Sequence, residues 1–187
     1  MKLVLAITGA SGVIYGIRLL EELRKRSVEV ILIISEAGKK VIEFETDYKL
    51  DKISSMASEH YSELDYKSPV VSGSYKIDGM IICPCSMKTV SAISNGYSAN
   101  TVSRAAECCL KEGKPLIIVF RETPLSLIHL RNLTMLKEAG ACIMPAAPGF
   151  YHKPKTKEDL IDFIIGKILD QIGIENNIYR RWGVLDD

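Results

Sequence analysis

Short runs of β-branched and other apolar residues recur along this chain, and amphipathic helical patterns separate them. The runs cover residues 2–8, 28–35, 80–83, 116–120 and 142–145. A short continuous apolar run predicts a strand that is buried on both faces, as in a parallel sheet. We therefore expect an α/β fold in which a parallel sheet carries helices on both faces.

The segments between these runs predict the covering helices. Residues 13–26 carry an apolar stripe at helical spacing, made up of Ile14, Ile17, Leu20 and Leu23. Further helices are expected at residues 37–45, 87–95, 101–112, 126–138 and 157–172. The stretch 46–76 is polar and irregular, so no element is predicted there. We expect a single domain over residues 1–187, with a C-terminal tail from about residue 174.

Composition limits the classes of function. The formal net charge is +1, so no broad basic surface is expected to attract nucleic acid or a membrane. No apolar stretch reaches the length of a membrane span, and the first residues lack a secretory signal pattern. The five cysteines have no metal-ligand spacing and are expected to be buried thiols. We therefore expect a cytoplasmic protein.

Residues that follow the predicted strands share a polar and glycine-rich character. They are Thr8–Gly12, Ser35, Pro84–Thr89, Arg121–Glu122 and Ala146–Tyr151. In open parallel sheets, ligands bind at the carboxyl ends of the strands. The agreement among these five segments therefore predicts a ligand site at that edge of the sheet.

The loop Thr8-Gly9-Ala10-Ser11-Gly12 leaves the first strand and opens a helix. Glycines let a ligand approach the backbone, and free amides at a helix N-terminus favour an anion. The loop matches neither the dinucleotide fingerprint nor the P-loop. A plain tight turn with a helix cap fits it equally well. The segment at Ser86 allows the same two interpretations. Ser86 suits a structural N-cap, whereas Lys88 and Thr89 after it would add hydrogen-bond donors to an anion site.

Two cations lie on the polar face of the helix predicted at residues 101–112. Arg104 and Lys111 are seven positions apart, which places them on one stripe about 10 Å apart along the axis. A solvated charged face is one interpretation. The other is that the stripe faces a second subunit and delivers two cations to its site.

Together, these segments resemble a flavin prenyltransferase of the UbiX type. The matching segments are Thr8–Gly16, Glu43–Asp47, Ile82–Thr89, Asn95–Ala106, Lys114–Pro124, Gly140–Pro154 and Arg181–Gly183. The run Pro145–His152 is the most specific of them. The resemblance implies a Rossmann-like, flavodoxin-type fold. It also implies transfer of a dimethylallyl group from dimethylallyl monophosphate to N5 and C6 of reduced FMN, without a metal.

The resemblance also assigns roles to individual residues. FMN would contact Gly9, Ala10, Ser11, Ser35, Ser86, Met87, Lys88, Thr89 and Arg121. The donor phosphate would meet Arg104, Lys111, Tyr151 and Lys167, the last standing where many members have Arg. Ser11 and Glu45 would manage protons, and Glu122 would order the cations around the phosphate. Trp182 would form one wall beside the allyl group.

The same resemblance implies an oligomeric assembly and a partner enzyme. The family forms dodecamers, so Arg104, Lys111 and Glu45 would complete a site shared between subunits. The product, prenylated FMN, would serve a UbiD-type decarboxylase in ubiquinone biosynthesis or aromatic acid decarboxylation.

Two other functions stay open at this point. Tyr97–Thr101 partly resembles a motif of the FMN-dependent peptidyl-cysteine decarboxylases of the same superfamily, but their catalytic histidine has no counterpart here. A simple FMN-binding or electron-transfer module would not need four phosphate-binding side chains.

Overall fold

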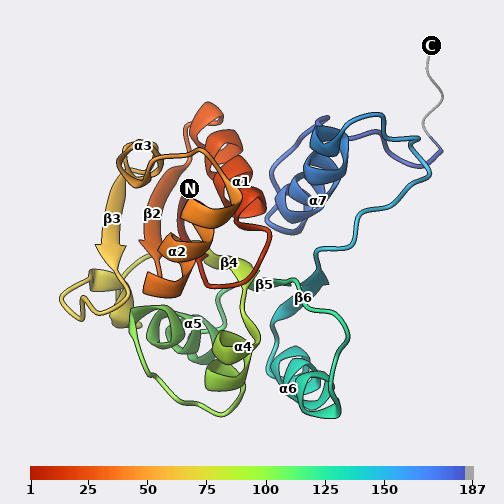
Figure 1. The fold of residues 1–187 in the computed structure, drawn as a ribbon. Helices are drawn as coiled ribbons and strands as arrows, with labels where there is room; N and C mark the ends of the chain where they lie inside the picture. The colour runs from red at the N-terminus through yellow and green to blue at the C-terminus, as the bar shows by residue number, and fades with distance from the viewer. Residues whose placement is uncertain (184–187) are drawn as a thin grey trace.

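A six-stranded parallel sheet forms the centre of the computed structural model, which describes residues 1–183 (Figure 1). Its strands are β1 (Lys2–Ile7), β2 (Glu29–Ile34), β3 (Glu59–Ser62), β4 (Gly79–Cys85), β5 (Leu116–Phe120) and β6 (Cys142–Pro145). They pair in the order β3-β2-β1-β4-β5-β6, and every pair is parallel. The predicted parallel α/β architecture is confirmed.

The strand β3 is the one that the sequence did not predict. It lies in the polar stretch 46–76, together with the short helix α3 (Leu50–Ser54) and the 3-10 turn η1 (Pro69–Val71). β3 is an edge strand that pairs only with β2, and none of its residues is fully buried. An edge strand of this kind has no continuous apolar run, so hydrophobic patterning cannot reveal it.

Helices cover both faces of the sheet, as predicted (Figure 1). Their bounds are α1 (Val13–Lys25), α2 (Glu36–Glu45), α4 (Met87–Ser94), α5 (Thr101–Lys111), α6 (Leu127–Glu138) and α7 (Lys157–Gln171). Side chains of β1 alternate between the two faces: Leu3 and Leu5 pack with α1 and α7, whereas Val4 and Ala6 pack with α4 and α5. The helices α5 and α7 therefore lie on opposite faces of the sheet.

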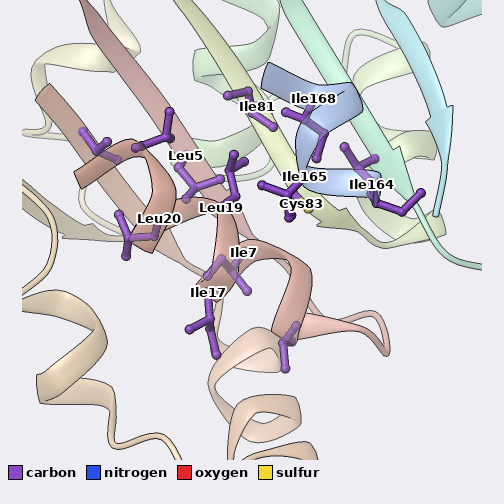
Figure 2. Close-up of a cluster of buried hydrophobic side chains, with 14 of the residues drawn as sticks. Leu5, Ile7, Ile17, Leu19, Leu20, Ile81, Cys83, Ile164, Ile165 and Ile168 are labelled. Carbon is purple, nitrogen blue, oxygen red and sulfur yellow. The ribbon is translucent and has the colours of Figure 1, made fainter. Parts of the chain in front are cut away.

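The core between α1, α7 and the sheet is tightly packed, as Figure 2 shows. Isoleucines of α7 and leucines of α1 meet the strands β1 and β4 there. Gly16 of α1 lies so close to β4 that a Cβ atom on it would come within 2.2 Å of the Cys83 carbonyl oxygen. This close approach holds the N-terminal part of α1 against the carboxyl end of β4.

A buried carboxylate of α1, Glu22, binds the arginine that joins α1 to α7. Glu22 accepts hydrogen bonds from Arg18 Nη1 at 2.5 Å and Lys25 Nζ at 2.8 Å, and a third from Arg26. Arg18 also binds Asp162 of α7, with 2.8 Å between Nε and Oδ1. Because the Glu22 side chain is only 3% exposed, these partners are needed to stabilise its ionised carboxylate in the fold.

Glu22 should make the stability of the protein fall at acid pH. Burial alone would raise the pKa of Glu22, but hydrogen bonds from Lys25, Arg26 and Arg18 lower it from 4.5 to about 2. A carboxyl group with a lowered folded pKa stabilises the fold above its unfolded pKa and loses this contribution as the pH falls through the folded value. We expect the free energy of unfolding to decline between pH 4.5 and about 2, and Glu22→Gln to lack this part of the decline.

Urea unfolding at a series of pH values measures this effect. The exposed Glu138 provides the control, since Glu138→Gln should keep the wild-type pH dependence. Parallel pH curves for Glu22→Gln and the wild-type protein would contradict the prediction.

Candidate functional site

The strands β1 and β4 are neighbours in the sheet although they are not consecutive in the chain. The order of strands reverses between them, and ligands bind at such a switch point in open α/β sheets. The two loops that follow these strands are bonded together there. Thr8 N and Oγ1 donate to the Pro84 carbonyl oxygen at 3.1 and 2.8 Å, and Ser86 N donates to Thr8 Oγ1 at 2.8 Å.

The first loop receives a carboxylate from the end of α2. Gly12 and Val13 donate their backbone N–H groups to Glu45 Oε2 at 2.8 and 3.3 Å. Gly12 is the N-cap of α1, has a φ of 95° and makes no side-chain cap hydrogen bond. Negative charge is favourable at a helix N-terminus, so Glu45 replaces the missing cap.

This contact places Glu45 beside Ser11 of its own chain. The resemblance implied that Glu45 helps to complete a site between subunits. Within one chain, however, Glu45 already lines the same cavity as Ser11. The reason is that α2 packs beside α1 and ends next to the loop that opens α1.

A cavity of about 690 Å³ lies at this point, which is within the range of small-molecule sites. It brings together Ser11, Glu45 and Arg121, which come from three separate segments of the predicted site. The other lining residues are Gly12, Ile14, Tyr15, Thr46, Asp47, Tyr48, Ala146, Lys157 and Ile161.

Arg121 carries an unused donor at this cavity. Its Nε atom is sealed from solvent and has no hydrogen-bond partner among the described residues. A buried donor without a partner costs free energy, so such a group is typically completed by a ligand or water. A phosphate or a flavin carbonyl oxygen would accept this hydrogen bond. The residues present therefore fit a flavin nucleotide.

The remaining FMN candidates do not line this cavity. Ser35 and Ser86 cap helices: Ser35 Oγ accepts from Gly38 N at 3.0 Å, and Ser86 Oγ accepts from Thr89 N at 3.3 Å. The predicted N-cap role of Ser86 is confirmed. Met87 packs on the core, and Lys88 is exposed. Contacts of these residues with FMN stay predictions.

The four donor-binding candidates, Arg104, Lys111, Tyr151 and Lys167, come from two helices and a loop. None of them lines the cavity of Ser11 and Arg121 in the described part of the molecule. Arg104 lies on α5 and Lys167 on α7, on opposite faces of the sheet. That both bind one phosphate, in a site shared between copies of the chain, stays a prediction.

Arg104 is held by its own helix and by the turn η1. Its Nη1 atom lies 3.0 Å from Glu107 Oε2, and its Nε atom donates to the Val71 carbonyl oxygen at 3.1 Å. Glu122, to which the resemblance assigned the ordering of such cations, accepts a hydrogen bond from its neighbour Thr123 N at 3.0 Å, and its assigned role stays a prediction. Within one chain, the carboxylate that orders Arg104 is Glu107.

Sequence reasoning gave no site role to several cavity residues, among them Tyr15, Tyr48 and Lys157. Burial raises the pKa of the Tyr15 phenol, so it stays protonated as a donor at neutral pH. Tyr48 donates its hydroxyl to Glu21 Oε1 at 2.9 Å. Tyr48 lies in the irregular stretch and Lys157 is an exposed first residue of α7, so neither carried a sequence signal.

The strand order, the glycine-opened helix at the switch point and the cavity with its unpartnered arginine define an α/β nucleotide-binding protein. Residues 1–169 match the family described as Flavoprotein. Flavin prenyltransferase UbiX of Methanocaldococcus jannaschii is 49% identical over 99% of this chain and 100% of its own. The chain therefore belongs to the flavin prenyltransferases and is a prenyltransferase enzyme, as the sequence resemblance indicated.

Two solved structures are similar over nearly the whole chain. AnUbiX (PadA1), in complex with FMN and dimethylallyl pyrophosphate, has a TM-score of 0.96 and 42% identity, covering 99% of this chain and 98% of that one. A dodecameric FMN-dependent UbiX-like decarboxylase from Escherichia coli O157:H7 has a TM-score of 0.96 and 41% identity, covering 98% and 100%. Within residues 1–183, no helix has the length and apolarity needed to cross a membrane.

Proposed function

We propose that this enzyme binds reduced FMN and transfers to it a dimethylallyl group from dimethylallyl monophosphate. The observation that carries the proposal is the cavity at the switch point, where Ser11, Glu45 and the unpartnered Arg121 Nε meet. The complex of AnUbiX with FMN and dimethylallyl pyrophosphate supports FMN and a phosphate ester of the dimethylallyl group as the ligands here. When bound, reduced FMN supplies N5 and C6 as the atoms that accept the prenyl group.

The side chains of the cavity then have distinct tasks. Arg121 donates its buried Nε–H group to an FMN oxygen and so orients the ring. Ser11 hydrogen-bonds at N5, and Glu45 takes the proton that leaves C6. The backbone N–H groups of Gly12 and Val13 hold the Glu45 carboxylate in place for this transfer.

Cations promote departure of the donor phosphate. Arg104, Lys111 and Lys167 bind it together with the hydroxyl of Tyr151. Negative charge grows on the phosphate as the allyl C–O bond breaks, and preplaced cations stabilise that charge without reorganising. These side chains supply the charge, so the proposal includes no metal ion.

The proposed assembly is a homododecamer whose sites combine residues of different copies. The placement of Arg104 and Lys167 on opposite faces of one chain supports it, as does the dodecameric relative. We place the enzyme in the cytoplasm, where its prenylated FMN passes to a UbiD-type decarboxylase.

Mass measurement of the flavin tests the proposed reaction. The protein is incubated anaerobically with reduced FMN and dimethylallyl monophosphate, and a parallel reaction contains the diphosphate. The expected product is FMN heavier by one five-carbon prenyl unit, formed with the monophosphate. An unchanged flavin in both reactions, with FMN shown to be bound, would contradict prenyl transfer, whereas product from the diphosphate alone would correct the donor.

A further inference from the structure

The chain after α7 is anchored by a single carboxylate. Asp170 accepts a hydrogen bond from Tyr179 Oη at 2.7 Å and one from Asn176 Nδ2 at 2.9 Å. Arg181 binds both carboxylate oxygens, at 2.9 Å from Nη1 and 2.7 Å from Nη2. Hydrogen bonds from a charged, bidentate arginine are among the stronger side-chain contacts.

Packing adds a second hold at the same place. Gly166 lies one turn before Asp170 on α7, and a Cβ atom on it would come within 2.1 Å of Tyr179 Cδ1. The missing side chain therefore makes room for the Tyr179 ring, which is 8% exposed and packs on Phe163 at 5.3 Å between centroids. The guanidinium of Arg181 lies 5.0 Å from the centre of the Tyr179 ring, a distance that allows a cation–π contact.

Trp182 comes directly after the anchored Arg181. Its ring meets Tyr151 edge to face, with centroids 5.3 Å apart at 86°. Trp182 is 78% exposed, so little other packing holds it in this position. Tyr151 is itself fixed against Phe163 of α7 at 5.8 Å. The anchor at Asp170 thus sets the distance between Trp182 and Tyr151.

We propose that Asp170 is a positioning residue for prenyl transfer, which holds the tail so that Trp182 and Tyr151 form one wall of the donor site. The inference rests on the proposed function, because it takes Tyr151 as a residue of that site. Asp170 itself does not touch the reactants. Its effect is to keep two aromatic rings where they exclude water and face the positive charge that develops on the allyl group.

Three variants of the full chain, loaded with FMN, release the tail in different ways. Asp170→Asn removes the charge, Arg181→Gln removes the bidentate donor, and Gly166→Ala displaces the Tyr179 ring. Arg181 lies on the surface, so Arg181→Gln should fold normally even if the other two do not. The matched control is Asp162→Asn, which breaks a carboxylate–arginine pair of the same helix away from the tail.

Two measurements detect release of the tail and do not depend on the enzymatic reaction. Trp182 is the single tryptophan of the chain, so its emission and its quenching by acrylamide report only on the tail. Trypsin cleavage after Arg180 reports how often the tail detaches. We expect cleavage about tenfold faster in the tail variants, because proteolysis follows the population of the open state. We also expect a lower anisotropy of the Trp182 emission, since a ring that is already 78% exposed gains mobility when the tail is released.

A third readout tests the role in the reaction. The KM for the prenyl donor should rise about tenfold in the tail variants, since a misplaced wall weakens orientation of the donor, while FMN affinity stays unchanged. A purely structural role would lower the amount of active enzyme and leave KM alone. The control Asp162→Asn should match the wild-type protein in all three readouts.

The anchor at Asp170 and its positioning role can be disproved separately. Wild-type fluorescence and cleavage in both Asp170→Asn and Arg181→Gln would overturn the anchor. A released tail with an unchanged donor KM would overturn the positioning role. A wild-type enzyme that leaves FMN unmodified would instead reject the proposed function, and the fluorescence and cleavage results would still decide the anchor.

Discussion

Replacing Arg104 with alanine is expected to lower kcat for prenyl transfer by about 10²- to 10³-fold while FMN stays bound, a loss comparable to that of one preorganised transition-state donor. The reason is that Arg104, in the proposed site, binds the leaving phosphate, whose negative charge is greatest in the transition state. Its guanidinium is already held by Glu107 and the Val71 carbonyl group. Little free energy is therefore spent on ordering it during the reaction.

Single-turnover rates of flavin modification and FMN titrations measure the two effects separately. Arg131 of α6 supplies the control, because Arg131→Ala removes an exposed arginine outside the candidate site and should leave kcat unchanged. Loss of FMN binding in parallel with kcat in Arg104→Ala would place Arg104 at the flavin instead. A protein that is monomeric in solution would contradict the shared site.

The second large effect is expected for Glu45→Gln. Removal of a general base typically costs about 10²- to 10⁴-fold in rate, and we expect kcat to fall within this range. The amide oxygen of Gln can still accept the N–H groups of Gly12 and Val13, so the cap of α1 and the fold should survive. The loss would then reflect the proton acceptor and not the structure.

Glu43 provides a matched control on the same helix, since it is an exposed carboxylate two residues away. Glu43→Gln should keep wild-type kcat in the same assay, and thermal unfolding should show that both variants are folded. Wild-type turnover by Glu45→Gln would remove Glu45 from the reaction.

Mixed oligomers of Arg104→Ala and Glu45→Gln chains test whether Arg104 acts in the site of another copy. Glu45 meets Ser11 within one chain, whereas Arg104 is proposed to act on the site of another copy. Oligomers refolded from Arg104→Ala and Glu45→Gln chains should therefore contain some sites in which both residues are intact. Part of the activity should return on mixing, and its complete absence would contradict sharing of Arg104.

Much of the fold could be predicted because its signals are local. The apolar runs of the buried strands and the stripe on α1 arise from residues close together in the chain. The bounds of the helices that were predicted lie within one residue of those observed, and only the short α3 was missed among the described residues. The cap at Ser86 is local in the same sense. The edge strand β3 escaped prediction because none of its side chains is fully buried, so its residues form no apolar run.

The sequence by itself determined the parallel α/β fold, the strand-end position of the site and, through its motifs, the resemblance to the flavin prenyltransferases. Only the tertiary structure decided which of these residues meet. It joined Glu45 to the loop of Ser11 in one chain, placed Arg104 and Lys167 on opposite faces of the sheet, and brought Trp182 against Tyr151. The physical reason is that such meetings depend on how helices pack across the sheet, between residues far apart in sequence, and local periodicity holds no information about that packing.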